Sequence, residues 1–513
     1  MSGRANVAKA TYASVGLIIM YFSLKPKSKN KDELAQLSQL SRRFSLSVVL
    51  ICSSNVDVLS ANMQLFSTVL SIILVCCVTC DGARILSIFP VPSPSHNILA
   101  TRLTKELVNR GHEVTLVSPF PQKESKNFKS VQLTGFLEKQ KEMMKDLLDI
   151  NKQSFFQKTL QITNICTLYS ETTLNHTNFR KLLNSDATFD LIIIEAMFNE
   201  AHVGIGYHYN APVIMLSTVG SSSIVNKFVA NPAPSSMVPD TFLGLPSRMN
   251  FVQRMVNTLA TGLMDLFHQF YHLRVQNNLL QEYFPDAPHL QDVIREHVSL
   301  LLLNGDPSFD GAKPLMPNMV HIGGYHVEEP KALPQVNKQL TSHPRLRVFI
   351  THGGLLSTTE AIYHGAPIVG IPIFGDQKAN MVRAVELGIG TSVAFDNITV
   401  ETLTDAIREV VNNKIYKVRA TQRSRLLKDQ PQRPLDTAMF WIEYVLRNKD
   451  TSHLKNPAIY LEWYQINMLD VHATLAGVVI LVSALFYLLM KKLCCSKKAE
   501  KKRQQELNKK KKN

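Results

Sequence analysis

The sequence predicts an α/β protein with parallel sheets, followed by one transmembrane helix near the C-terminus. From residue 84 onward, short apolar segments alternate with longer amphipathic segments, which is the pattern of parallel strands joined by helices. Residues 473–490 then form a run of eighteen uncharged, mostly apolar residues, close to the minimum length that crosses a bilayer core. With 513 residues and 45% hydrophobic composition, the chain can build two or three domains with sizeable cores.

The chain before residue 84 is predicted to lie outside the fold. Residues 63–83 contain an apolar stretch with the length of a signal sequence core, followed by small residues, so we expect cleavage between Cys80 and Ala83. This signal begins 62 residues after the chain starts, and residues 1–62 are predicted to be a non-domain extension. If the signal is not cleaved, residues 65–78 would act as a signal anchor.

The first domain is predicted to span residues 84–313. It opens with an apolar strand, a helix that ends near Gly111 and a second strand, which together make a βαβ unit. Two further buried strands and a long amphipathic helix follow, at 189–198, 211–217 and 250–273. Ligands of such sheets bind beyond the carboxyl ends of the strands. Residues between Gln140 and Leu183 are rich in Met, Phe and Leu, which suits an apolar ligand pocket and equally suits an ordinary core.

A Pro-rich linker and a second domain follow. The linker is predicted at 314–342 and the domain at 343–433, because the alternation of strands and helices resumes there. We expect strands at 347–351, 367–372 and 391–395 and helices at 355–365, 377–388 and 399–413. Further helices at 434–472 lead to the membrane span.

The positive charge of the chain is concentrated after the membrane span. Residues 491–513 contribute +9 of the formal net charge of +15, and a basic flank of this kind is cytoplasmic. The preceding region is therefore expected in the lumen. No basic stripe interleaved with aromatic residues remains, so we expect no nucleic-acid partner. Lys510 and Lys511 stand at the fourth and third positions from the C-terminus, the placement of a dibasic retrieval signal for the endoplasmic reticulum.

Cysteine usage argues against a disulfide framework and against a zinc site. Cys166 is the only cysteine in the expected lumenal region, so neither an intramolecular disulfide nor a cysteine pair for a metal is available there. We expect no metal. The triplets at Asn175 and Asn397 permit N-glycosylation.

Residues 351–380 carry the strongest chemical signal. A predicted strand delivers His352 to a turn formed by Gly353 and Gly354, and a helix begins immediately afterwards. The free backbone N–H groups of a helix N-terminus attract anions, and the Ser357 hydroxyl and the His352 imidazole would reinforce them. A diphosphate fits this site. Glu360 follows near the first turns of the helix, where its carboxylate can accept both hydroxyls of a ribose.

This block resembles the donor signature of the UDP-glycosyltransferase family. In that signature a Ser follows the histidine by five residues, a Glu by eight, an Asp-Gln pair by 24 and 25, and an Asn by 28. Counted from His352, this chain has the same residue types at all of these positions: Ser357, Glu360, Asp376, Gln377 and Asn380. The resemblance is to membrane-bound animal members of the insect type. It implies a GT-B fold, in which two Rossmann-like domains face a cleft, and it extends loosely from residue 84 to the tail.

The resemblance also implies the roles of these residues and the reaction. His352 and Ser357 would contact the diphosphate, Glu360 the ribose, and Asp376 with Gln377 the transferred sugar. The donor would be UDP-glucose or UDP-glucuronate, which is a co-substrate, so no cofactor is expected. The acceptor would be a small lipophilic molecule, as in detoxifying conjugation. The resemblance also allows homo-oligomers, or hetero-oligomers with related transferases. A nucleotide-binding oxidoreductase is disfavoured because no G-x-G-x-x-G follows the first strand, and no Asp-x-Asp pair is present to bind a metal.

His96 is the candidate general base. It follows the first strand immediately before the first helix, where a side chain can face the donor across the cleft, and imidazole has a pKa near neutrality. The family's catalytic histidine occupies this loop. Its carboxylate partner is commonly Asp at the end of the strand near residue 195; here Glu195 stands there, and Asp190 at the start of the strand is the less favoured alternative.

The start of the second domain departs from the family pattern. Members begin this domain with a strand and turn of the type YFSLGS, followed by a Trp-x-Pro-Gln element that binds uracil. The Trp and Gln positions fall on Pro334 and Asn337, so the second domain is expected to be truncated. A YFSL sequence within residues 16–29 leaves a displaced strand as an alternative. The chain is therefore expected to be either an active transferase or a silent, membrane-anchored relative that binds a partner or ligand.

Overall fold

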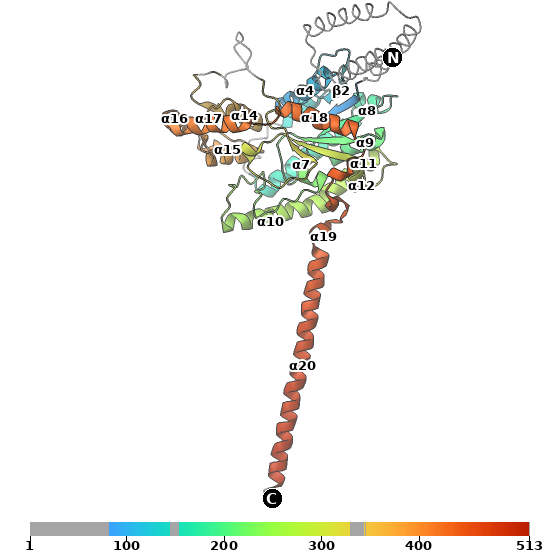
Figure 1. The fold of residues 1–513 in the computed structure, drawn as a ribbon, viewed down its shortest axis with the longest axis vertical. Helices are drawn as coiled ribbons and strands as arrows, with labels where there is room; N and C mark the ends of the chain where they lie inside the picture. The colour runs from blue at the N-terminus through green and yellow to red at the C-terminus, as the bar shows by residue number, and fades with distance from the viewer. Residues whose placement is uncertain (1–81, 144–152, 329–342, 344, 512–513) are drawn as a thin grey trace, which may run out of the picture. The chain divides into compact units, whose positions relative to one another are not determined.

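The computed structural model describes residues 82–143, 153–328, 343 and 345–511 (Figure 1). The predicted extension and nearly all of the signal sequence lie outside these residues. So do Pro334 and Asn337, where the uracil-binding element is expected. The part from Gly82 onward forms one compact unit, built from two parallel sheets and the helices around them.

The first sheet has seven parallel strands in the order β3-β2-β1-β4-β5-β6-β7. The strands are β1 (Arg84–Ile88), β2 (Glu113–Ser118), β3 (Phe128–Gln132), β4 (Leu191–Glu195), β5 (Val213–Ser217), β6 (Val298–Leu303) and β7 (Met319–His321). Every residue of β4, β5 and β6 is buried, as expected for central parallel strands covered on both faces. Strand β7 pairs with β6 inside the range predicted as linker, so the first sheet continues past residue 313.

Helices cover both faces of this sheet, and alternate side chains of the strands belong to two different cores. Leu86 and Ile88 of β1 lie in one core, whereas Ile85 and Phe89 lie in the other, because successive side chains of a strand point to opposite faces. The covering helices include α4 (Pro94–Asn109), α5 (Phe136–Met143), α7 (Phe155–Asn175), α8 (Thr177–Leu183), α9 (Gly204–Tyr209) and α12 (Leu290–His297).

The predicted helix at 250–273 is longer than expected and contains an irregular turn. Helix α10 (Phe251–Phe267) passes through the π-helical turn η4 (His268–His272) directly into α11 (Leu273–Tyr283). Asn250 and Gln253 form a reciprocal capping box at its start, which satisfies two backbone N–H groups that the helix leaves free.

In the described part of the chain, the second sheet has three parallel strands in the order β10-β9-β8. They are β8 (Phe349–Thr351), β9 (Ile368–Gly370) and β10 (Gly390–Ser392), and the helices around them are α14 (Leu355–Tyr363), α15 (Gln377–Glu386), α16 (Val400–Asn412) and α17 (Lys414–Lys428). Each predicted strand and helix of this domain is therefore present with shorter bounds. A separate core that includes Ile362, Ile368 and Ile389 holds them together.

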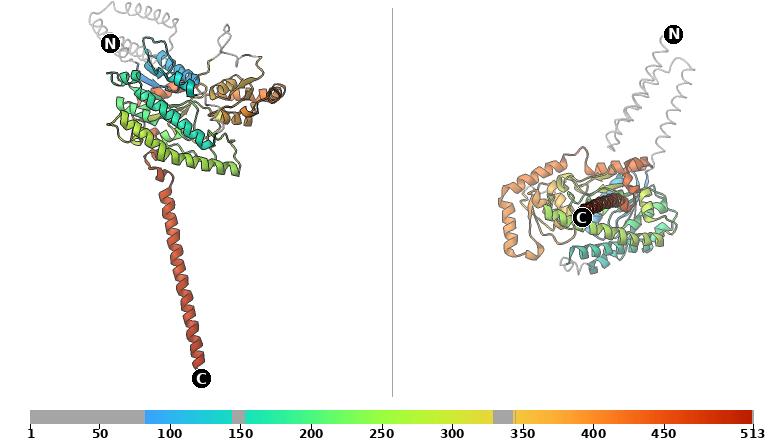
Figure 2. Two further views of the ribbon diagram at one scale, coloured as in Figure 1. Left: turned by 180° about the vertical axis from the view of Figure 1, so that it is seen from behind. Right: turned by 90° about the horizontal axis from the view of Figure 1, so that it is seen from below.

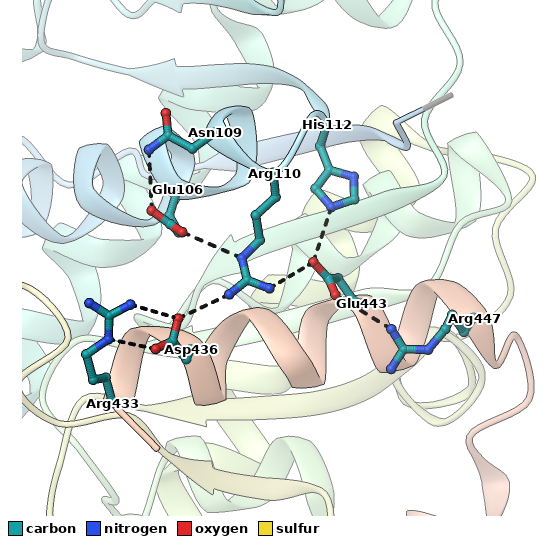
Figure 3. Close-up of polar contacts among 8 residues, drawn as sticks. All are labelled: Glu106, Asn109, Arg110, His112, Arg433, Asp436, Glu443 and Arg447. Carbon is teal, nitrogen blue, oxygen red and sulfur yellow. Dashed lines mark hydrogen bonds and ion pairs between the residues drawn. The ribbon is translucent and has the colours of Figure 1, made fainter. Parts of the chain in front are cut away.

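Helix α18 (Pro434–Arg447) returns to the first sheet. Met439 and Ile442 are fully buried in the same core as Ile85. Beside this apolar contact, the Arg110 guanidinium lies 3.1 Å from an Asp436 oxygen and 3.2 Å from a Glu443 oxygen (Figure 3). The chain thus closes on its first domain before it turns toward α19 (Trp463–Ile466) and α20.

Helix α20 (Leu469–Lys510) is one continuous helix of 42 residues. Within the described part of the chain it is the single helix long and apolar enough to cross a membrane. It contains the predicted span 473–490 and most of the predicted tail 491–513, and its side chains are exposed.

Candidate active site

A cavity of about 1600 Å³ is lined by residues that follow strands of both sheets. His96 lines it from the first sheet. His352, Ser357, Glu360, Asp376 and Gln377 line it from the second. The structure thus brings the candidate base and the predicted donor block to one cavity, since both sheets present the carboxyl ends of their strands there.

His96 and Glu195 are hydrogen-bonded to each other through Nδ1 and Oε1. They are 99 residues apart in the sequence, but β1 and β4 are parallel neighbours in which Ile88 pairs with Ile194, so the residues that follow them meet. The Glu195 side chain is fully buried and that of His96 is 13% exposed. The second carboxylate oxygen of Glu195, Oε2, accepts a hydrogen bond from the Val91 backbone N–H at 3.4 Å.

This environment favours the protonated form of His96. Burial acts to lower its pKa, but the charge and hydrogen bond of Glu195, together with the charge of Asp376, outweigh burial and raise the pKa above its ordinary value of 6.5. When Nδ1 donates to the carboxylate, Nε2 is the nitrogen left to accept a proton. The alternative partner Asp190 lies at the start of β4, where its Oδ2 accepts the Arg84 backbone N–H at 2.7 Å, away from His96.

The turn between β8 and α14 requires both of its glycines. Gly353 has φ +80°, and a Cβ there would lie 2.7 Å from Cγ of Met381. A Cβ on Gly354 would lie 2.4 Å from Nε2 of His352. Gly354 is also the N-cap of α14 and has no side chain to cap it, so the first backbone N–H groups of α14 stay available for an anion.

Ser357 is held inside this turn. Its hydroxyl donates to the Gly354 carbonyl at 3.0 Å and shares a hydrogen bond with the Thr351 hydroxyl at 2.9 Å. Ser357 therefore shapes the turn and still lines the cavity.

Gln377 and Asn380 hold the neighbouring loop in place. Oε1 of Gln377 accepts the backbone N–H groups of Ile373 at 2.8 Å and Phe374 at 3.1 Å. Nδ2 of Asn380 donates to the Gly353 carbonyl at 3.0 Å and to Asp376 Oδ2 at 2.7 Å. Asn380 thus joins the glycine turn to the Asp376 carboxylate without lining the cavity itself.

Asp376 and Glu360 supply the carboxylates on the donor side. Burial raises the pKa of Asp376, against the opposing hydrogen bond of Asn380 and the charges of His96 and His352. Burial also raises the pKa of Glu360, whose side chain is 40% exposed and whose Oε1 lies 3.9 Å from Nε2 of His326.

His326 is a neighbour of the site that the sequence did not identify. Its side chain is almost fully buried, and burial lowers its pKa to about 4, so it is neutral at pH 7. It falls in the range predicted as linker, where no periodic pattern or motif distinguishes it, and only the fold brings it to Glu360.

Apolar side chains form the wall of the cavity on the side of the first sheet. Phe155, Ile162, Ile165 and Tyr169 of α7 line it, together with Phe242. Part of the Met-, Phe- and Leu-rich region between 140 and 183 therefore faces the cavity, while Leu174 and Phe179 of the same region are core residues. Both interpretations of that region apply, and Tyr169 satisfies both, because it belongs to the core and also lines the cavity.

Comparisons with known proteins place the chain in a family. The family described as UDP-glucoronosyl and UDP-glucosyl transferase matches residues 84–341 and 331–505. UDP-glucosyltransferase 2 of Dactylopius coccus is 28% identical over 80% of this chain and 91% of its own length. UDP-glucuronosyltransferase 1-2 of Rattus norvegicus is 28% identical over 78% of this chain and 90% of its own. The solved structure of CalG4, the calicheamicin glycosyltransferase, is similar with a TM-score of 0.47 and 13% identity, over 72% of this chain and all of that one.

A second family, described as ATP synthase regulation, matches residues 1–28. This range contains the YFSL sequence, so its interpretation as a displaced strand of the second domain is not retained. The transferase match covers most of the remaining chain, and the expected GT-B arrangement of two parallel sheets on one cavity is confirmed. From residue 84 onward, the chain is a member of the UDP-glucuronosyl and UDP-glucosyl transferase family.

Proposed function

We propose that this protein transfers glucose or glucuronate from the UDP-sugar to a hydroxyl of a small lipophilic acceptor, with inversion at the anomeric carbon. The observation that carries this proposal is the buried His96–Glu195 pair, which lies on the same cavity as the donor block. The apolar wall formed by α7 suits a lipophilic acceptor.

In the proposed reaction His96 acts as the general base. Nε2 takes the proton of the acceptor hydroxyl, while the oxygen of that hydroxyl attacks the anomeric carbon of the sugar from the face opposite UDP. The bond between that carbon and the diphosphate oxygen breaks, and UDP leaves with the electron pair. Glu195 stabilises the imidazolium that forms and holds the ring in its reactive tautomer.

The second sheet would bind the donor. The N-terminus of α14, His352 and Ser357 would hold the diphosphate, whose negative charge grows as the bond breaks. Glu360 would accept the ribose hydroxyls, and Asp376 and Gln377 would contact the hexose. Asn380 positions Asp376 and the glycine turn.

The test is UDP release with UDP-glucose and UDP-glucuronate and a phenolic acceptor. We expect His96→Ala to lower kcat about 10²- to 10⁴-fold, the range contributed by a general base. Because Glu195 raises the pKa of His96, activity should fall as the pH drops through that pKa, and Glu195→Gln should move this acidic limb to lower pH. Full turnover in His96→Ala would refute the assignment of the base.

A second candidate function is that of a catalytically silent relative that binds a partner or ligand. The small number of described strands in the second sheet supports this candidate. The first sheet follows the Rossmann order 3-2-1-4-5-6 with one strand added, whereas among the described residues the second sheet has only β8, β9 and β10, with β8 at one edge. The missing strands would be those that precede β8 in the chain. Strand β8 would then lack its inner neighbour, and Ile350 in its middle is 46% exposed. An unpaired strand edge of this kind is unfavourable.

Restoring the family segment after Pro334 separates the two candidates. The segment would supply the missing strand and the aromatic surface for uracil, and base stacking on an aromatic ring contributes roughly 1 to 3 kcal/mol. Little activity in the natural chain and clear activity in the restored one, in the same microsomes, would identify the natural chain as the silent relative. Equal turnover would show that the segment is dispensable.

The proposed location is the endoplasmic reticulum membrane, with a lumenal catalytic region. Lys510 and Lys511 at the end of α20 support retrieval from the cytoplasmic side, and Asn175 and Asn397 are both exposed and available for glycosylation. Changing both lysines to Ser should release the protein toward the cell surface, and endoglycosidase treatment should lower its apparent mass if those sites are lumenal and carry glycans.

A further inference from the structure

Helix α10 carries its larger apolar side chains on the outside of the protein. Phe251, Met255, Leu259, Leu263, Leu266 and Phe270 are between 43% and 71% exposed. Their spacings of four, four, four, three and four residues put them on one face of a helix, which continues through η4. We call these six residues the α10 face.

The opposite face of α10 is the one that packs against the protein, and it is less apolar. Its buried residues are Asn257, Ala260 and Met264, and Asn257 donates to the backbone carbonyls of Ser235 and Val238. A surface helix of a water-soluble protein has the reverse arrangement, with its apolar stripe inward. An apolar surface of this extent is typical of a site that contacts a partner or a membrane.

The α10 face adjoins the segment that enters the predicted membrane span. The ring centroids of Phe270 and Trp463 lie 5.3 Å apart with their planes at 73°, and Trp463 begins α19, six residues before α20 starts at Leu469. In Figures 1 and 2, α10 runs close to α19. Trp and Tyr are enriched at the membrane–water boundary, and both Tyr464 and Tyr460 are exposed beside Trp463.

We propose that the α10 face is a lipid-binding surface, inserted into the leaflet from which α20 emerges. The helix would lie in the plane of the interface with its apolar face among the lipid chains. This inference depends on α20 spanning a membrane and not on the transferase activity. Lipid is the occupant that the structure favours over a second copy of the chain, because the face is continuous with the anchor through the contact of Phe270 with Trp463.

This surface also reaches toward the cavity. Phe267 at the end of α10 packs edge-to-face on Phe156 of α7, with ring centroids 6.0 Å apart, and the next residue, Phe155, lines the cavity. A lipophilic acceptor dissolved in the bilayer would therefore meet an apolar surface that leads from the lipid to α7.

The test uses the full-length chain in vesicles of phosphatidylcholine, with and without bromine atoms on the acyl chains to quench nearby tryptophan. Leu259→Trp adds a reporter on the α10 face, and Val418→Trp adds a matched one on α17, because Leu259 and Val418 are 62% and 60% exposed. Each variant is compared with the parent chain, and its thermal midpoint is measured to verify folding. Leu263→Trp replaces the first reporter if Leu259→Trp does not fold.

We expect brominated lipid to quench the added fluorescence of Leu259→Trp, as for a side chain at the boundary of headgroups and acyl chains, and to leave that of Val418→Trp unchanged. An unquenched reporter at Leu259 in a folded protein would overturn the proposal. The proposal would also be overturned if a Leu259→Cys variant formed cross-linked dimers while the Leu259→Trp reporter stayed unquenched. The α10 face would then be a contact between two copies of the chain. UDP binding, measured on the same samples, reports separately on the donor site.

Discussion

The amide of Asn380 offers a sharp test of how the proposed donor site is held together. Its Nδ2 makes two hydrogen bonds, to the neutral Gly353 carbonyl at 3.0 Å and to the Asp376 carboxylate at 2.7 Å. Asn380→Asp keeps the shape of the side chain but replaces this donor with an oxygen. Both hydrogen bonds are lost, and a second carboxylate then faces Asp376.

The expected cost follows from these two contacts. A buried hydrogen bond between neutral groups contributes about 0.5 to 1.5 kcal/mol, and one to a charged group about 1.5 to 3 kcal/mol, so the substitution should destabilise the site by about 2 to 4.5 kcal/mol. If about 2 kcal/mol of this is expressed in UDP binding, the Kd should rise roughly 30-fold. Repulsion should also raise the pKa of Asp376 further.

The assay combines calorimetric titration with UDP and the thermal midpoint of the same sample. Asn109→Asp is a matched control, because Asn109 is exposed and its Nδ2 also faces a carboxylate, that of Glu106, at 3.4 Å (Figure 3). Surface changes of this kind usually cost less than about 0.5 kcal/mol. If Asn380→Asp bound UDP and melted like Asn109→Asp, the idea that Asn380 positions the glycine turn would be wrong.

Three further outcomes test the fold and its response to pH. Ile442→Ala should destabilise the protein by about 2 to 5 kcal/mol, because it opens a cavity in the core where α18 meets the first sheet, and urea denaturation would measure this. Arg110→Met should cost under about 1 kcal/mol despite its several partners, since the guanidinium is 32% exposed; a larger loss would mean that this network holds α18 in place. Burial lowers the pKa of His202 and of His268 from 6.5 to about 4 in the folded protein. Between these two pH values the two histidines bind more protons in the unfolded chain than in the folded one. The free energy of unfolding should therefore decrease on acidification. In urea titrations from pH 7.5 to 5, His268→Gln should weaken this decrease.

The local patterns of the chain were sufficient to predict most of its elements. Alternating apolar and amphipathic segments predicted the strands and helices of both sheets, because hydrophobic periodicity reflects which side of each element is buried. The spacing from His352 to Gln377 predicted which residues line the cavity from the second sheet, since a strand, a glycine turn and a helix fix their relative positions over a short range. The prediction of a membrane span rested only on its length, its lack of charge and its basic flank, and the structure has one long apolar helix there.

Contacts between distant segments were decided by the tertiary structure alone. The family resemblance indicated Glu195 as the partner of His96, but the contact itself depends on β4 lying beside β1, and neither strand's own sequence determines that order. Asn380 has no periodic or compositional feature that shows it will reach Gly353, and His326 lies in a range that resembled a linker. The return of α18 to the first sheet is equally invisible in its own sequence.

The same limit applies to the α10 face. The sequence of 250–273 predicted an amphipathic helix, yet periodicity describes only how apolar residues are distributed around a helix. It cannot tell which side the rest of the protein covers. Only the packing of Asn257 and Ala260 against the body of the protein leaves Leu259 and Leu263 outside, because burial depends on what a helix packs against as well as on its own residues.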